Sequence, residues 1–193
     1  MTRAGKREEW LPSRWARPLI AAALAVSLLL GGAFLSVGRL HSSPSDYLDH
    51  PAQPVSDDQS QAQVLESAKQ LVTIAGLHTT NAGYLLVSCK DRDNPPYQGA
   101  IYLTFALPAD VRPDTYFPTI AEALVADGWT EGLPPNDHVF GKTLTKDAVI
   151  AITYPQRDDK SLGVLRLYGQ CRNMNDHRND TTAWIDITGQ FKP

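Results

Sequence analysis

Residues 98–107, QGAIYLTFAL, indicate the fold class of the chain most directly. Apolar side chains occupy every second position of this stretch, at Ile101, Leu103, Phe105 and Leu107. A period of two is typical of a β-strand that buries one face. Other short apolar runs bounded by turn residues predict strands at about 84–89, 139–144, 148–154 and 163–170, with a short final strand near 185–187.

Two helices are predicted among these strands. From about Asp57 to Ala75, apolar residues recur at steps of three and four, and Gly76 marks the end. A second helix follows the break at 108–113, with Asp114 as its N-cap and Gly128 at its C-terminus. The order of elements and their short connections predict an α+β fold, a mostly antiparallel five-stranded sheet with two helices on one face.

A single transmembrane helix is predicted ahead of this domain. Residues 18–38 contain no charged side chain, and at about 1.5 Å per residue such a run just crosses a hydrocarbon core of about 30 Å. The basic flank lies in residues 1–17, which predicts a cytoplasmic tail there, a flexible linker at 39–56 and an extracytoplasmic α+β domain at 57–193. A cleaved signal peptide ending near residues 36–38 is the alternative, although the apolar stretch is longer than is usual for one.

Charge narrows the range of partners. Six of the 18 basic residues and two of the 21 acidic ones precede Leu40, so the remainder carries 12 basic and 19 acidic residues, a net charge of −7. Phosphate backbones repel such a domain, and nucleic acid is therefore not expected as a partner. Within the predicted span, Ala23, Ser27 and Gly31 form a row of small residues that allows weak self-association of helices.

The two cysteines of the chain, Cys89 and Cys171, follow two of the predicted strands. An even number of cysteines in an exported domain predicts a disulfide between them. A redox or metal-binding pair is less well supported, because neither cysteine belongs to a C-x-x-C motif. We therefore expect the pair to be structural.

Histidine adjoins aspartate at two places outside the linker, Asp137-His138 and Asp176-His177. If the fold brought the two pairs together, they could ligate zinc or supply a general base. Solvated loop residues are the more common reading of such pairs. The sequence also lacks G-x-S-x-G and the nucleotide-binding glycine motifs, so we assign no catalytic residue, metal ligand or cofactor.

Several short segments carry a family resemblance. They are residues 88–90 (SCK), 96–99 (PYQG), 128–129 (GW) and 168–172 (YGQCR). Together they resemble small envelope proteins of mycobacteria and related actinobacteria over roughly residues 83–172. The resemblance implies an exported domain that is lipid-modified or singly anchored and has no settled activity. The chain departs from the lipoprotein members because no cysteine precedes Cys89.

Two functions from different classes remain open. The first is a membrane-anchored, extracytoplasmic binding or accessory module that docks on another envelope or membrane protein, since tethering raises the local concentration of a binding domain. The second is an envelope hydrolase or metal-assisted enzyme that uses the two aspartate–histidine pairs.

Overall fold

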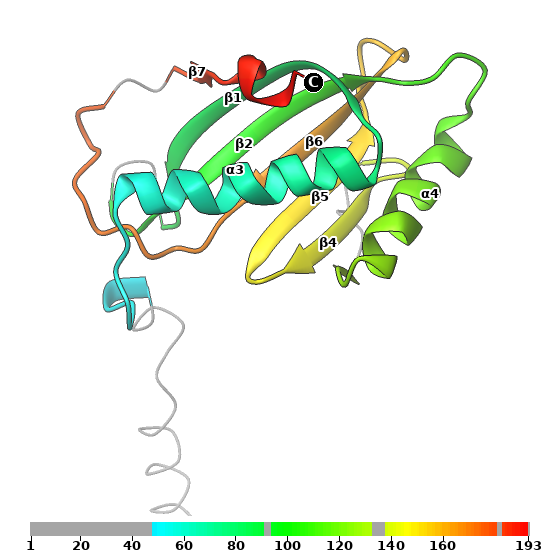
Figure 1. The fold of residues 1–193 in the computed structure, drawn as a ribbon. Helices are drawn as coiled ribbons and strands as arrows, with labels where there is room; N and C mark the ends of the chain where they lie inside the picture. Colours follow the sequence, from blue (N-terminus) through cyan, green and yellow to red (C-terminus); the bar gives the residue numbers. More distant parts are fainter. Residues whose placement is uncertain (1–47, 91–93, 133–137, 181–182, 193) are drawn as a thin grey trace, which may run out of the picture. The chain divides into compact units, whose positions relative to one another are not determined.

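An antiparallel sheet of seven strands forms the centre of the domain (Figure 1). The strand order is β3-β4-β5-β6-β2-β1-β7. The strands are β1 (His78–Ser88), β2 (Tyr97–Ala106), β3 (Thr130–Glu131), β4 (Lys142–Lys146), β5 (Val149–Pro155), β6 (Leu162–Tyr168) and β7 (Ile185–Asp186). The η1 turn, Thr188–Phe191, follows the last strand.

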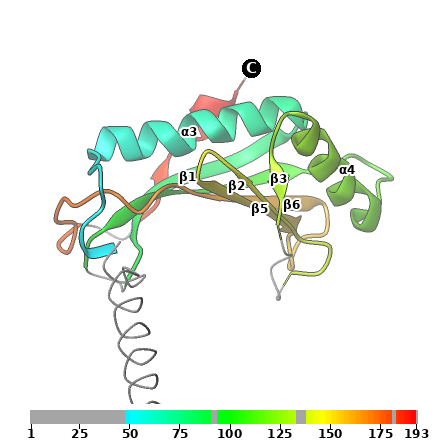
Figure 2. The same ribbon diagram turned by 90° about the horizontal axis from the view of Figure 1, so that it is seen from below.

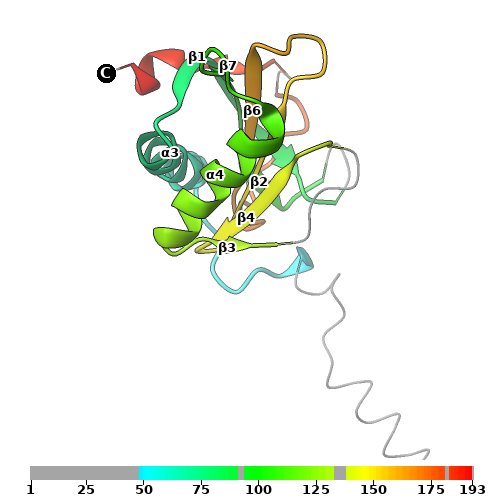
Figure 3. The same cartoon turned by 90° about the vertical axis from the view of Figure 1, so that its right-hand side faces the viewer.

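Both long helices cover the same face of this sheet (Figure 2). Helix α3 (Asp57–Ile74) contacts β2 and β1, whereas α4 (Pro113–Ala126) contacts β3, β4 and β5. Figure 3 shows α3 nearly end-on and α4 crossing at an angle to it. The prediction of two helices on one face of an antiparallel sheet is confirmed.

Local sequence explains where each helix begins. Ser56 caps α3: its hydroxyl accepts a hydrogen bond from the Gln59 backbone, and the Gln59 side chain accepts one from the Ser56 backbone. Helix α4 begins with Pro113 at its first turn, where a missing N–H costs little. Its N-cap is Arg112 rather than the predicted Asp114, which instead lies in the first turn and forms an ion pair with Arg112.

The core lies between the helices and the covered face of the sheet. Helix α3 contributes Val64, Ala68 and Leu71, and α4 contributes Phe117, Ile120 and Leu124. Alternate residues of β2 and β6 complete it, with Leu103, Phe105, Leu165 and Leu167 all at most 1% exposed. The residues between them along each strand therefore point to the other face of the sheet.

Three strand predictions need correction. The sheet has seven strands rather than five. Strand β3 was missed, since two residues are too few to show a period, whereas β7 corresponds to the short final strand predicted near 185–187 and belongs to the same sheet. Strand β1 begins at His78, well before the predicted start at about residue 84, and its pairing is irregular between Thr79 and Asn81. Strand β4 begins at Lys142, not at Val139.

The structure, a computed structural model, describes residues 48–90, 94–132, 138–180 and 183–192. The predicted transmembrane segment, 18–38, lies outside these ranges, and among the described helices none is long and apolar enough to cross a membrane. The folded unit begins earlier than the predicted boundary at residue 57. Pro51 is buried, and the Val55 amide donates a hydrogen bond to the Arg172 carbonyl at 3.0 Å.

Candidate functional site

The face of the sheet opposite the helices is not covered by any described helix (Figure 2). Tyr102 on β2, Tyr154 on β5 and Arg166 on β6 point to this face, between the buried residues of their strands. We call it the uncovered face. Such a face normally carries small polar residues, so the aromatic and cationic side chains here require an explanation.

Five side chains form a continuous row across the uncovered face. The His138 ring stacks on Tyr154 with centroids 3.6 Å apart, and the guanidinium carbon of Arg166 lies 5.6 Å from the Tyr154 centroid. The same guanidinium carbon lies 5.3 Å from the Tyr102 centroid, and Tyr102 meets Trp184 at 6.2 Å. We call these five residues the aromatic row.

Strand register places these side chains together. Tyr102 lies directly opposite Arg166 across the β2–β6 pair. Tyr154 pairs with Val164, two residues from Arg166, a diagonal separation that long side chains can bridge. On the far side of Tyr102, β1 presents Gly83, and a Cβ atom there would lie only 3.0 Å from Cβ of Trp184. The absence of a side chain at Gly83 therefore allows Trp184 to reach the row.

Arg166 is the charged centre of the row. Its Nε atom is buried and has no hydrogen-bond partner among the described residues. The guanidinium remains charged at every physiological pH, and the two tyrosine rings stabilise it through cation–π contacts. Burial raises the pKa of Tyr154, while the nearby positive charge of Arg166 acts in the opposite direction. Tyr154 therefore stays neutral beside the cation.

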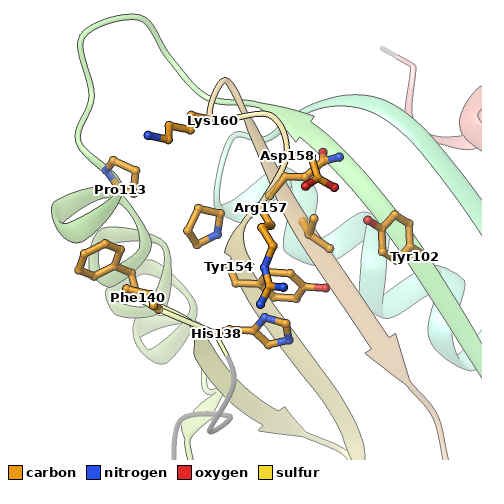
Figure 4. A pocket seen from close by; sticks show the side chains of 12 residues that line it. Tyr102, Pro113, His138, Phe140, Tyr154, Arg157, Asp158 and Lys160 are labelled. Carbon is orange, nitrogen blue, oxygen red and sulfur yellow. The ribbon is translucent and has the colours of Figure 1, made fainter.

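A groove of about 770 Å³ lies at the end of the row where His138 stacks on Tyr154 (Figure 4). Its walls come from the β5–β6 loop, the start of α4 and the turn at 138–140. Two apolar side chains of that turn are exposed, Val139 at 70% and Phe140 at 49%. Phe140 takes a left-handed backbone conformation, with φ 61°, which is uncommon for a bulky residue. The predicted strand at 139–144 is therefore wrong in its first residues.

A smaller cavity of about 400 Å³ lies at the other end of the row. Tyr102, Arg166, Tyr168 and Trp184 line it. Trp184 is 48% exposed, and Ile150 on the same face is 42% exposed. The uncovered face thus presents large apolar side chains on both sides of Arg166.

The predicted aspartate–histidine pairs do not form one site. His138 belongs to the groove, while Asp137 lies outside the described residues. His177 instead contacts Tyr97, at the first residue of β2, with ring centroids 4.9 Å apart. His138 stacks on Tyr154, which pairs with Val164, and Val164 in turn pairs with Thr104. Thr104 lies seven residues after Tyr97 on β2. At about 3.3 Å per residue, the two histidines are separated by roughly 23 Å of strand.

His177 is held in a network of hydrogen bonds. Its Nε2 lies 3.1 Å from an Asp57 carboxylate oxygen, and its Nδ1 lies 2.7 Å from Asp180. Asn173, which is fully buried, and Asn175 each donate a side-chain hydrogen bond of 2.7 Å to the same Asp57 oxygen. Both ring nitrogens of His177 are thus engaged, which suits a structural role.

Electrostatics at this end reflect the same network. Burial alone would raise the pKa of Asp57, but the hydrogen bonds from Asn173 and Asn175 and the proximity of His177 together lower it. Asp176 is not part of the network, because it pairs with Arg178, whose hydrogen bonds hold the Asp176 pKa well below its ordinary range. Within the described part of the chain, no three histidine, cysteine or acidic side chains are grouped so as to hold a metal ion.

The disulfide lies next to this network. Cys89 and Cys171 are joined, with Cα atoms 6.0 Å apart. The bond links the end of β1 to the segment that continues into Asn173, whose backbone pairs with both Tyr97 and Val55. Both cysteines of the chain are therefore used in one structural link.

Sequence reasoning missed the aromatic row. Its five members come from five different strands, turns or loops and share no local motif. The available signal was the identity of the residues at alternate positions of the strands: Tyr102, Tyr154 and Arg166 stand where a solvated face ordinarily carries small polar residues.

The family model and the similar proteins that match this chain carry the same description. The model of the family described as "Putative lipoprotein LppJ" matches residues 56–190. The chain belongs to the LppJ family. LppJ of Mycobacterium bovis is 40% identical over 170 residues, which cover 88% of this chain and 89% of that protein. LppJ of Mycobacterium tuberculosis strain H37Rv is 39% identical over 178 residues, covering 92% and 93%.

The LppJ match confirms the resemblance to mycobacterial envelope proteins. It extends beyond residues 83–172 at both ends and includes α3 and the final strand. No solved structure matches the chain significantly. The name of the relatives describes a lipoprotein, whereas both cysteines of this sequence are joined in the disulfide.

Proposed function

We propose that this protein is an envelope-attached, extracytoplasmic binding module that docks on another envelope protein through its uncovered face. The observation that carries the proposal is the aromatic row, with Arg166 held between Tyr102 and Tyr154. A surface arginine does not need two aromatic rings for its solvation. They hold its guanidinium in one position, which lowers the entropy lost when a partner binds.

The composition of the face supports docking. Protein interfaces are enriched in tyrosine, tryptophan and arginine, and such residues dominate binding energy when they lie at the centre of the contact. The row contains all three types, its Trp184 is exposed, and the exposed Ile150 lies on the same face. The enzyme alternative has less support, because His177 contacts Tyr97 at the start of β2 whereas His138 stacks on Tyr154 of β5, so the two histidines are far apart.

Attachment to the envelope is supported by the family and by the sequence ahead of the domain. LppJ relatives are named as lipoproteins. Here we propose that residues 18–38 act as a membrane anchor in place of an acylated cysteine, with residues 1–17 in the cytoplasm and the domain outside. Ala23, Ser27 and Gly31 would then face a neighbouring helix and allow weak self-association.

Site-specific photo-cross-linking in native membranes tests the docking face. A photoreactive amino acid at Ile150 or Thr104, both on strands of the uncovered face, is expected to give a discrete higher-mass adduct. The matched control is the same amino acid at Val125, which is 46% exposed on α4. Arg166→Ala should abolish the adducts while leaving the protein in the membrane. Equal adducts from Val125 and Ile150 would contradict docking through this face.

A further inference from the structure

The groove at the His138 end of the row has the dimensions and walls of a small-molecule site. Its volume of about 770 Å³ falls within the range of roughly 300–1,000 Å³ that such sites occupy. Pro113, Phe140, Pro155 and Val164 supply apolar walls, and the stacked rings of His138 and Tyr154 supply a flat one. The groove can therefore hold a planar or apolar body.

The cations at the groove set it apart from the rest of the surface. Arg157 and Lys160 line it from the β5–β6 loop, and Figure 4 shows Lys160 extending toward Pro113 while Arg157 extends toward Tyr154. Asp158 is the acidic residue of the lining, and Figure 4 shows it on the side of Tyr102. Two cations and one carboxylate therefore line the groove. Arg166 does not line it, but its guanidinium carbon lies within 5.6 Å of the ring centroids of Tyr102 and Tyr154, which do.

The cations that line the groove have no carboxylate partner among the described residues. Six other basic side chains of the described residues each pair with a carboxylate: Lys69, Lys90, Arg112, Lys142, Lys146 and Arg178. Among the same described residues, Arg157, Lys160, Arg166, Arg172 and Lys192 form no ion pair, and of these five Arg157 and Lys160 line the groove together. In a domain with an excess of acidic residues, unpaired cations gathered at one groove favour an anionic ligand.

We infer that this groove binds a small organic anion, a carboxylate or phosphate monoester carried on a planar apolar body. The anionic group would lie between Arg157 and Lys160, where charge-assisted hydrogen bonds are strongest. The body would lie against Phe140, Pro155 and the His138–Tyr154 stack. This inference goes beyond the proposed docking function, because the groove occupies one end of the uncovered face and need not contact the protein partner.

Isothermal titration of the full-length protein in phosphatidylcholine nanodiscs, with empty nanodiscs subtracted, tests the ligand class. The probes are 2-naphthoate, 2-naphthyl phosphate, the neutral isostere 2-naphthamide and inorganic phosphate alone. Both naphthyl anions are expected to bind about tenfold or more tightly than 2-naphthamide. Inorganic phosphate should bind more weakly than 2-naphthyl phosphate because it has no aromatic ring to pack against the apolar walls. Equal affinity for 2-naphthoate and 2-naphthamide would overturn the inference.

Variants locate the ligand. The double variant Arg157→Ala with Lys160→Ala should bind 2-naphthoate about tenfold more weakly, while its affinity for 2-naphthamide stays unchanged. Phe140→Ala should lower the affinity for both compounds. Lys69→Ala, on the helix-covered side, removes one positive charge and should change neither. The circular dichroism spectrum of each variant checks that it is folded. Unchanged 2-naphthoate affinity in the double variant would place the ligand elsewhere and overturn the inference.

A membrane surface is the other source of the same chemistry, and a vesicle arm distinguishes it. Phosphatidylglycerol vesicles should not compete with 2-naphthoate beyond the effect of their ionic strength. Binding to these vesicles in the absence of naphthoate binding would overturn the inference in favour of a membrane contact. The docking test uses Ile150, Thr104 and Arg166, so failure of one proposal can be recognised without failure of the other.

Discussion

The two ends of the sheet each hold a histidine next to an aspartate in the sequence, yet the two neighbourhoods are built differently. At the His177 end, polar groups are joined to one another: Asp57 accepts hydrogen bonds from Asn173 and Asn175 and contacts His177. At the His138 end, Arg157 and Lys160 line an open groove without carboxylate partners among the described residues. We call them the closed end and the groove end.

The difference teaches how similar residues acquire different roles. A polar group that is satisfied within the protein stabilises the fold and has no capacity left for a ligand. A cation that stays unpaired contributes little to stability but retains its full capacity to bind an anion. Substitutions at the closed end should therefore lower stability, while substitutions at the groove end should affect binding.

The largest expected effect is loss of the disulfide at the closed end. The bond closes a loop of 82 residues, for which chain entropy predicts a stabilisation of about 4.5 kcal/mol. The double variant Cys89→Ser with Cys171→Ser should lose about this free energy of unfolding in urea titrations followed by circular dichroism. Lys160→Ala at the groove end is the control, and its free energy of unfolding should differ from that of the unchanged protein by no more than about 0.5 kcal/mol. A loss below about 1 kcal/mol in the double variant would show that the closed end does not depend on this link.

Asn173 should give the next largest effect. Its side chain is fully buried, donates to the Asp57 carboxylate and accepts from the Asn175 amide. Asn173→Ala removes a hydrogen bond to a charged group and leaves buried polar groups unpaired, which should cost about 2–3 kcal/mol. Asn175→Ala, whose side chain is exposed, should cost less in the same urea titration. The reverse order of the two variants would contradict a role for burial.

Much of the fold was predictable from sequence. Helix α3 was predicted from its apolar period and the glycine that follows, and β2, β5 and β6 from short apolar runs. These signals are local, since each lies within one element. The two-residue strand β3 was not predicted, and β7 was predicted only as a short final strand outside the five-stranded sheet. The pairing of both strands depends on neighbours distant in the chain.

The two ends of the sheet could not be told apart from sequence for the same reason. Tyr102 meets Arg166 only through the register of β2 with β6, and His177 meets Asp57 across 120 residues of sequence. A shift of one residue in register would move every side chain of a strand to the other face. The residue types indicated which side chains could bind a ligand or form hydrogen bonds. Strand register determines which of these side chains lie close together in the fold.

The two histidines provide a direct comparison of the ends. His177→Ala removes two contacts to carboxylates and an edge-on contact with Tyr97, and it should cost about 2 kcal/mol. His138→Ala removes one stacked ring, a contact worth roughly 0.5–1.5 kcal/mol. Urea titration measures both. Binding of 2-naphthoate should fall only in the His138 variant, and a fall of the same size in the His177 variant would contradict the separation of the ends.

The smallest expected effect is the dependence of stability on pH through Asp57. Its pKa in the folded protein lies below the ordinary value of 3.8, so the unfolded chain binds the proton more readily. The stabilisation is therefore fully present above about pH 4 and is lost as the pH falls through the folded pKa. Asp57→Asn should lower stability at pH 7 and flatten the decline below about pH 4. Asp58→Asn, in the same first turn but outside the network, is the control and should retain the decline. A decline of equal steepness in Asp57→Asn would show that other carboxyl groups control the acid limb.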